Sequence, residues 1–143
     1  MSDANVEVVR SLFEAFNRGD IEAGAKVIDQ CVVFDVRGME LDNEDFARVY
    51  FGPEGVRDFW RSWLPAWTDM QVEVRWVRGV GERVIVWIHQ RQVGRVSGVP
   101  VEFSVAWDFL FRDGKIVRMA FFRDEQKALE TLGLSEQDAH AGS

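Results

Sequence analysis

Apolar and polar positions follow two different periods along this chain. Apolar residues recur at steps of three and four over residues 4–17 and again from Gly55 to Trp67, which predicts two amphipathic helices, the latter kinked or ended by Pro65. Between them, Asp20 predicts the cap of a second, shorter helix whose apolar side holds Ile21, Ala25 and Ile28. The period then changes to two, which is typical of half-buried strands.

The strand pattern begins with the run CVVF, which ends at Asp35 and is followed by an acidic, irregular loop. Four further strands are predicted after the third helix, and a short closing helix ends at Gly133. The Asp-Gly pair in RDGK predicts a tight hairpin between the last two strands. The predicted ranges are 70–76, 83–93, 100–111 and 116–123 for the strands and 125–132 for the helix.

This order of elements predicts an α+β fold: a curved, mostly antiparallel sheet wrapped on three N-terminal helices, with a short C-terminal helix. The length of 143 residues fits one domain, which we assign to residues 1–134, with 135–143 as a flexible tail. A sheet wrapped on helices in this way tends to leave a cone, and an unfilled cone is a pocket.

Composition narrows the class of ligand. Apolar residues make up 47% of the chain, with eleven Phe and six Trp, enough to line a hollow as well as fill a core. The net charge of −7 opposes nucleic acid as a partner, and no apolar run is long enough to cross a membrane. We therefore expect a cytoplasmic protein that binds an apolar small molecule. The residues expected to contact it are Leu12, Phe16, Tyr50, Phe59, Trp63, Trp87 and Phe122.

Several motifs together resemble the SnoaL-like branch of the NTF2-like (cystatin-like cone) superfamily. They are FNRGD after the first helix, FDVRG, the helix start FGPEGVRDFW, SGVPVEF, the hairpin FRDGKIVRMAFF and EQKALETLGL. The resemblance covers residues 4–134 and implies the cone fold. It does not choose an activity, because the superfamily includes isomerases, cyclases, hydrolases, dehydratases and members without catalysis.

Two carboxylates resemble the catalytic pair of the steroid ketoisomerases in that superfamily. Val33, Asp35 and Gly38 match the V-x-D-x-x-G setting of their general base, and Asp108 resembles their second aspartate, which donates a hydrogen bond to the substrate oxygen. The resemblance therefore implies catalytic roles for Asp35 and Asp108 in an apolar pocket. The isomerases' tyrosine is replaced by Leu12, which cannot donate a hydrogen bond.

Each candidate also has a structural interpretation. Asp35 is either aimed into the pocket or solvated at a strand end. His89 lies in IVWIHQRQ and is either a catalytic acid or base or a hydrogen-bonded strand residue. Asp124 resembles an acidic residue of SnoaL-type polyketide cyclases, but it also suits the cap of the closing helix. The catalytic set of the limonene epoxide hydrolases is not matched, because Ile88 and Gln90 stand at two of its positions.

Alternation within residues 101–111 leaves two arrangements of the sheet. One face carries Phe103, Val105, Trp107 and further apolar residues, and the other carries Asp108 with polar and small neighbours. If the mixed face lines the cone, a second copy of the chain is expected to cover the apolar face, giving a homodimer through the outer sheet face. If the aromatic face is the core, Asp108 lies outside in water.

The sequence therefore predicts a cofactor-independent acid/base isomerase or cyclase that acts on an apolar cyclic carbonyl compound. Asp35 would move the proton, Asp108 would stabilise the oxyanion, and His89 is the further titratable candidate. The alternatives are a non-catalytic ligand-binding protein and, ranked last, an epoxide or ester hydrolase. The sequence predicts no cofactor and no metal site, because its two histidines are far apart and no nucleotide-binding motif is present.

Overall fold

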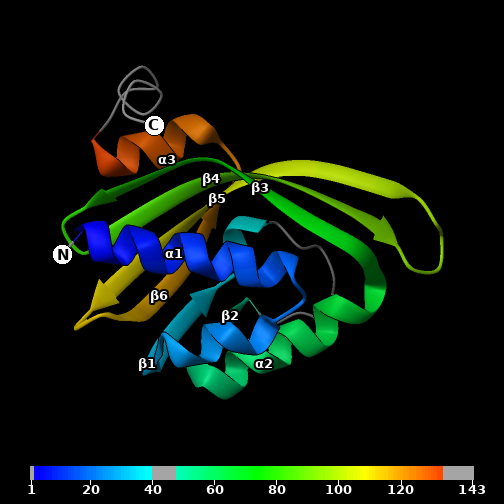
Figure 1. Ribbon diagram of the computed structural model, residues 1–143, viewed down its shortest axis with the longest axis horizontal. Coiled ribbons are helices and arrows are strands. Elements are labelled where there is room, and N and C mark those ends of the chain that lie inside the picture. The colour runs from blue at the N-terminus through cyan, green and yellow to red at the C-terminus, as the bar shows by residue number, and fades with distance from the viewer. Residues whose placement is uncertain (1, 40–47, 134–143) are drawn as a thin grey trace.

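A computed structural model describes residues 2–39 and 48–133 (Figure 1). Helices and strands follow one another in the predicted order, the second helix being a 3-10 helix, with two further 3-10 turns and one short strand between the predicted elements. In chain order they are α1 (Ser2–Asn17), η1 (Ile21–Lys26), β1 (Ile28–Asp35), η2 (Arg37–Met39), β2 (Val49–Phe51), α2 (Gly52–Trp63), η3 (Leu64–Ala66), β3 (Trp67–Val80), β4 (Arg83–Gly94), β5 (Pro100–Arg112), β6 (Lys115–Phe122) and α3 (Glu125–Leu132).

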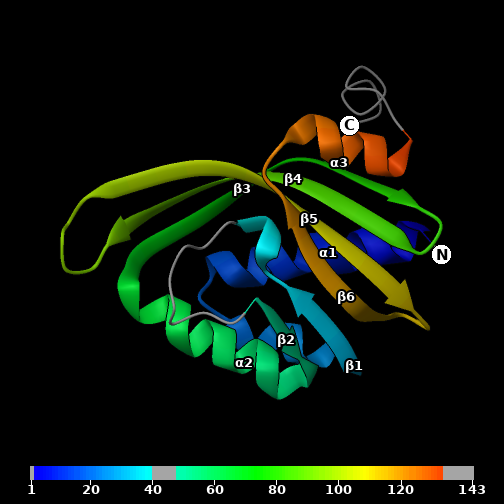
Figure 2. The same cartoon turned by 180° about the vertical axis from the view of Figure 1, so that it is seen from behind.

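Six strands form one curved sheet in the order β2-β1-β6-β5-β4-β3. Neighbouring strands are antiparallel except β1 and β6, which pair in parallel. Helices α1 and α2 lie on one face of the sheet and α3 lies on the other (Figure 1), while Figure 2 shows β6 beside β1 from behind. The predicted α+β fold, with its mostly antiparallel sheet and short closing helix, is confirmed.

The connection from α1 to β1 follows the predicted capping chemistry. Gly19 adopts a φ of 81°, the left-handed conformation that glycine favours after a helix end. The side chain of Asp20 accepts a hydrogen bond from the backbone N–H of Ala23 at 3.2 Å. The second helix is nevertheless a 3-10 helix that ends at Lys26, so the prediction that Ile28 belongs to it is wrong: Ile28 begins β1.

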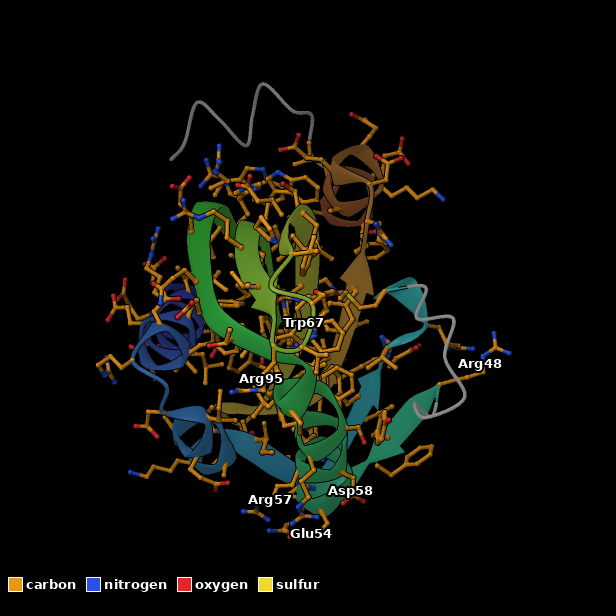
Figure 3. All side chains as sticks on the ribbon, turned by 90° about the vertical axis from the view of Figure 1, so that its right-hand side faces the viewer. Arg48, Glu54, Arg57, Asp58, Trp67 and Arg95 are labelled. Atoms are coloured by element: carbon orange, nitrogen blue, oxygen red, sulfur yellow. The ribbon has the colours of Figure 1, made fainter. Side chains whose placement is uncertain are left out.

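Helix α2 ends where Pro65 predicts, because proline cannot donate the backbone hydrogen bond that would continue it. The chain that follows is held by the loop between β4 and β5. The side chain of Arg95 donates to the carbonyl oxygens of Pro65 and Trp67 at 3.1 and 2.9 Å. Figure 3 shows Arg95 and Trp67 near one end of α2, with Glu54, Arg57 and Asp58 at the other.

Turn chemistry also agrees with the sequence at the C-terminal end. Asp113 and Gly114 have φ values of 52° and 78°, as a tight hairpin with two left-handed central residues requires. Asp124 accepts a hydrogen bond from the backbone N–H of Gln126 at 2.8 Å and so caps α3, which ends at the left-handed Gly133. The capping interpretation of Asp124 is therefore confirmed.

The two faces of the sheet bury different clusters. The face toward α1 and α2 holds the main core, to which Phe103, Val105, Trp107 and Phe109 of β5 belong. On the opposite face, Ala106 packs with Trp76, Ile85 and three residues of α3. The aromatic face of β5 is thus the inner face. The arrangement in which the mixed face lines the cone is wrong, because the chain's own helices cover the aromatic side.

This assignment removes the argument for a second copy over the aromatic face, and the homodimer stays a prediction. The acidic loop predicted after Asp35 falls largely on residues 40–47, and the predicted tail on 135–143; both lie outside the described residues. The described chain on either side of that loop forms the single helical turn η2 and the strand β2, and the sequence did not predict the strand. No helix within the described ranges is long and apolar enough to cross a membrane.

Candidate functional site

A cavity of about 490 Å³ lies between the inner face of the sheet and the helices α1, η1 and α2. Its wall is predominantly apolar, and the sheet and all three of these helices contribute to it. The apolar residues around it include Leu12, Phe13 and Phe16 of α1, Ile21 and Ala25 of η1, Val56 and Trp60 of α2, and Phe34, Val72, Trp107, Phe109, Ile116 and Met119 of the sheet.

The floor of the cavity is built from contacting aromatic rings. Trp107 stacks on Phe109, with ring centroids 5.5 Å apart and planes 11° apart, and on Phe34 at 5.9 Å and 19°. Phe121 meets the Trp107 ring edge-on at 4.3 Å, and Phe13 does so at 5.8 Å. Because each ring is held by its neighbours, this floor presents a closely packed apolar surface, which suits an apolar ring compound.

Titratable side chains border this cavity at its surface end. Among the described residues they are Asp20 and Glu22 beside η1, and Arg57 and Arg61 on α2. Arg57 lies 2.6 Å from Glu54 and 3.7 Å from Glu22, so a weak ion pair links η1 to α2. Away from this end, the polar side chain among the wall residues is Gln90 of β4.

The residues predicted to contact the ligand divide between three environments. Leu12 and Phe16 border the cavity. The other five lie outside the cavity wall, and their contact with a ligand stays a prediction. Tyr50, Phe59 and Trp63 are buried in the core beside it. Trp87 and Phe122 pack on the opposite face of the sheet near α3.

Sequence reasoning missed two kinds of wall residue. On α2, Trp60 borders the cavity and its ring meets that of Phe16 at 5.9 Å, whereas Phe59 and Trp63 turn toward the sheet. The apolar stripe marked all three residues but did not say which neighbour each would meet. On β4, Gln90 could have been found from the sequence, because it is the first polar residue at the alternating positions, which are apolar up to Ile88.

Asp35 lies on the sheet face opposite the cavity and is saturated with hydrogen bonds. The Nε and Nη2 atoms of Arg37 donate to its two oxygens at 2.9 and 2.6 Å, and the backbone N–H of Arg37 donates at 3.0 Å. Arg118 of β6 adds a fourth bond at 3.1 Å. The hydrogen bonds from Arg37 lower the pKa of Asp35. The expectation that Asp35 faces the apolar pocket is therefore wrong; its bonds join β1 to β6 and η2.

Asp108 lies two strands away from Asp35 on the same outer face, with Ala120 of β6 between them. A separate hollow of about 260 Å³ is bordered by Asp35, Asp108, Arg37 and Arg118. Asp108 is only 6% exposed, so the interpretation that it lies in water is wrong, as is the expectation that it faces the apolar cavity. Arg83 Nε approaches its Oδ1 to 3.5 Å, but that oxygen has no hydrogen-bond partner in the described structure.

Burial raises the pKa of Asp108 above its ordinary value of 3.8, and this predicts a pH-dependent stability effect. The ionised carboxylate opposes folding at neutral pH, whereas below the ordinary pKa both folded and unfolded chains carry the proton and the penalty disappears. We expect Asp108→Asn to raise the free energy of unfolding by about 1 kcal/mol at a pH of about 7 and to leave it unchanged at a pH of about 3.

Urea denaturation at both pH values measures this effect. A loss of stability for Asp108→Asn at neutral pH would instead show that the carboxylate gains more from Arg83 than it loses by burial.

His89 is likewise on the outer face. Its Nδ1 lies 3.1 Å from Ser104 Oγ and its Nε2 lies 2.9 Å from Glu102 Oε1, which matches the interpretation of a hydrogen-bonded strand residue. The ring therefore lies outside the cavity wall. The catalytic roles of Asp35, Asp108 and His89 remain predictions: the two aspartates border the smaller hollow, and His89 borders neither. No group of three metal-ligating side chains forms within residues 2–39 and 48–133.

Solved structures share this fold over almost their whole length. TerC, co-crystallised with polyporic acid, is 20% identical, with a TM-score of 0.74 over 90% of this chain and 97% of its own. An NTF2-like protein of unknown function from Burkholderia pseudomallei is 21% identical, with a TM-score of 0.75 and the same coverage. IdmH from Streptomyces antibioticus, a provisionally assigned polyketide cyclase, is 25% identical, with a TM-score of 0.70 over 91% of this chain and 99% of its own.

A comparison with curated protein sequences finds no significant match. The family model described as a SnoaL-like domain matches residues 9–119, which include the C-terminal half of α1, the cavity wall and most of the sheet. This match covers more than half of the chain, and it agrees with the cone-shaped arrangement of sheet and helices. The chain therefore belongs to the SnoaL-like domain family.

Proposed function

We propose that this protein binds a flat, mostly apolar cyclic small molecule in the cavity between α1, α2 and the inner face of the sheet. The observation that carries the proposal is the aromatic floor formed by Trp107 and its stacked neighbours at the base of a cavity of about 490 Å³. This volume lies in the range of small-molecule sites, which are commonly about 300–1,000 Å³. Burial of a ring system against such a floor supplies most of the binding free energy.

Two comparisons support the chemical class. The SnoaL-like family is associated with small-molecule binding and with isomerase or cyclase activity. TerC, which shares the fold, was co-crystallised with polyporic acid. For the present chain we propose a ligand of the same general kind, with fused or linked rings, rather than that compound itself.

The first test is binding of a neutral fluorescent aromatic probe, N-phenyl-1-naphthylamine, by the purified protein. We expect saturable binding with one probe per chain, because each chain supplies one such cavity. Asp108→Asn is the matched control on the opposite face of the sheet, and its affinity should equal that of the wild type. Absence of saturable binding, or its loss in Asp108→Asn, would contradict the proposal.

A second candidate is a cyclase, and the overall likeness to IdmH at 25% identity favours it. An acid/base mechanism through Asp35 and Asp108 lacks support, since neither carboxylate borders the cavity. Ring closure would then depend on the aromatic floor holding a flexible chain in a folded, reactive conformation. Mass spectrometry of a polyketide-like chain recovered after incubation tests for catalysis: a new cyclic product indicates a cyclase, whereas an unchanged mass and retention time for a chain shown to bind indicate binding without catalysis.

A further inference from the structure

Two buried glutamines interrupt the apolar inner face of β4. Its inward row runs through Val84, Val86 and Ile88, all fully buried, and continues with Gln90 and Gln92, which are 7% and 2% exposed. A carboxamide in an apolar layer costs free energy unless its donors and acceptor are hydrogen-bonded. The partners of these two side chains therefore bear on what the neighbouring cavity holds.

The two carboxamides bond to one another, and this uses only part of their capacity. Gln90 Nε2 donates to Gln92 Oε1 at 2.8 Å. A carboxamide has two N–H donors and one oxygen acceptor, so this bond leaves Gln90 Oε1 free to accept a further hydrogen bond. Gln90 borders the cavity, while Gln92 lies behind it. Gln92 is thus the buried member of the pair, and Gln90 is the member that borders the cavity.

The strands on either side offer Gln90 no alternative partner. Across the sheet it faces Val72 of β3 and Phe103 of β5, whose side chains are apolar. The backbone N–H and carbonyl of Val72 are bonded at 2.8 Å each by the side chain of Asn17 at the end of α1. The remaining hydrogen-bonding capacity of Gln90 is therefore directed at the cavity.

We propose that Gln90 determines the ligand specificity of the cavity and selects aromatic ring compounds that carry a hydroxyl or carbonyl oxygen at their buried edge. This inference rests on the proposed function and narrows it. In the observed orientation, Gln90 Oε1 accepts a hydrogen bond from a ligand hydroxyl. If both carboxamides turn over together, Gln92 donates to Gln90, and Gln90 presents an N–H to a ligand carbonyl instead.

Because one end of the Gln90 carboxamide bonds to Gln92, the other end presents either an acceptor or a donor to the cavity. The pair can therefore hydrogen-bond a keto group in one state and the corresponding enol or phenol in the other. A ring compound with a methyl group in place of the oxygen makes neither bond and leaves the cavity-facing atom of the Gln90 carboxamide without a hydrogen-bond partner in the complex. Hydrogen bonding to Gln90 thus distinguishes ring compounds that carry an oxygen from those that do not, whereas the aromatic floor by itself accepts both.

Equilibrium dialysis with 1-naphthol and 1-methylnaphthalene tests the inference, because these compounds share ring system and shape and differ in hydrogen bonding. The quantity measured is the affinity for 1-naphthol divided by that for 1-methylnaphthalene. We expect this ratio to fall roughly fivefold in Gln90→Leu relative to the wild type, the typical effect of one hydrogen bond. Gln71→Leu, on an exposed position of β3, is the matched control and should keep the wild-type ratio.

Gln90→Met serves as a second variant, since it keeps the unbranched shape and should show the same fall even if leucine disturbs the strand. Equal ratios in the wild type and both Gln90 variants would overturn the inference and leave the proposed function intact. Failure of the wild type to bind either compound would overturn the proposed function, and this inference with it.

Discussion

The double substitution Leu12→Trp and Ala25→Trp is expected to weaken binding of N-phenyl-1-naphthylamine roughly 70-fold. Both positions border the cavity, one from α1 and one from η1, and the Cβ that an alanine would add at neighbouring Gly24 lies 3.7 Å from Leu12 Cδ2. Two indole rings introduced there occupy space that the ligand needs. If they exclude about 100 Å² of ligand surface, the loss is about 2.5 kcal/mol at about 25 cal/mol per Å².

The matched control is the pair Ser11→Trp and Lys26→Trp. These residues are the immediate neighbours of Leu12 and Ala25, but both are exposed and lie outside the cavity wall. Fluorescence titration of the probe should give wild-type affinity for this control. If the two double variants bind the probe equally well, the ligand does not enter the cavity.

The second large effect is expected at Gly38, where Gly38→Ala should lower the free energy of unfolding by about 3 kcal/mol. A Cβ built on Gly38 would lie 2.1 Å from the backbone oxygen of Phe121 and 2.8 Å from its carbonyl carbon. Backbone atoms cannot move aside as a flexible side chain does, so η2 would have to separate from β6. The bonds of Asp35 to Arg37 and Arg118 hold this same junction and would be strained.

Gly24→Ala is the control for the loss of glycine as such. Its new methyl group would meet Leu12 Cδ2 at 3.7 Å, an ordinary contact, and its stability should stay within about 1 kcal/mol of the wild type. Urea denaturation of both variants measures the difference. Equal stabilities would show that the close approach of Gly38 to Phe121 is relieved at little cost.

The Gly38 contact also explains why the motif comparison wrongly predicted that Asp35 faces the apolar cavity. The spacing of Val33, Asp35 and Gly38 matches a catalytic motif, yet here the glycine permits close packing on β6 and the aspartate bonds two arginines. One of these arginines is two residues away in the chain and the other is eighty-three away. Spacing along one strand does not reveal a partner that far along the sequence.

Regular periodicity was sufficient for most of the architecture. The long amphipathic pattern of α1, the alternation in the last four strands and the Asp113–Gly114 turn each depend on local chemistry, and each was predicted close to its observed position. Strand β2 was missed because three residues are too few to show a period.

Which face of the sheet points inward could not be predicted from the sequence, for a different reason. Alternation divides β5 into two sets of side chains, but which set faces inward depends on where α1 and α2 pack, a tertiary property. The wrong choice moved Asp108 into the cavity and Trp107 out of it. Once the helices are in place, the aromatic set becomes the floor of the cavity. The polar side chain that the described strands contribute to the cavity wall is then Gln90.

A crystal structure of the protein with bound 1-naphthol is the most direct measurement of the central claim, that the ligand site is the apolar cavity on the inner face of the sheet. We predict the naphthol ring on the floor formed by Trp107, with its oxygen within hydrogen-bonding distance of Gln90. Naphthol bound instead in the hollow between Asp35 and Asp108, on the other face of the sheet, would contradict the claim.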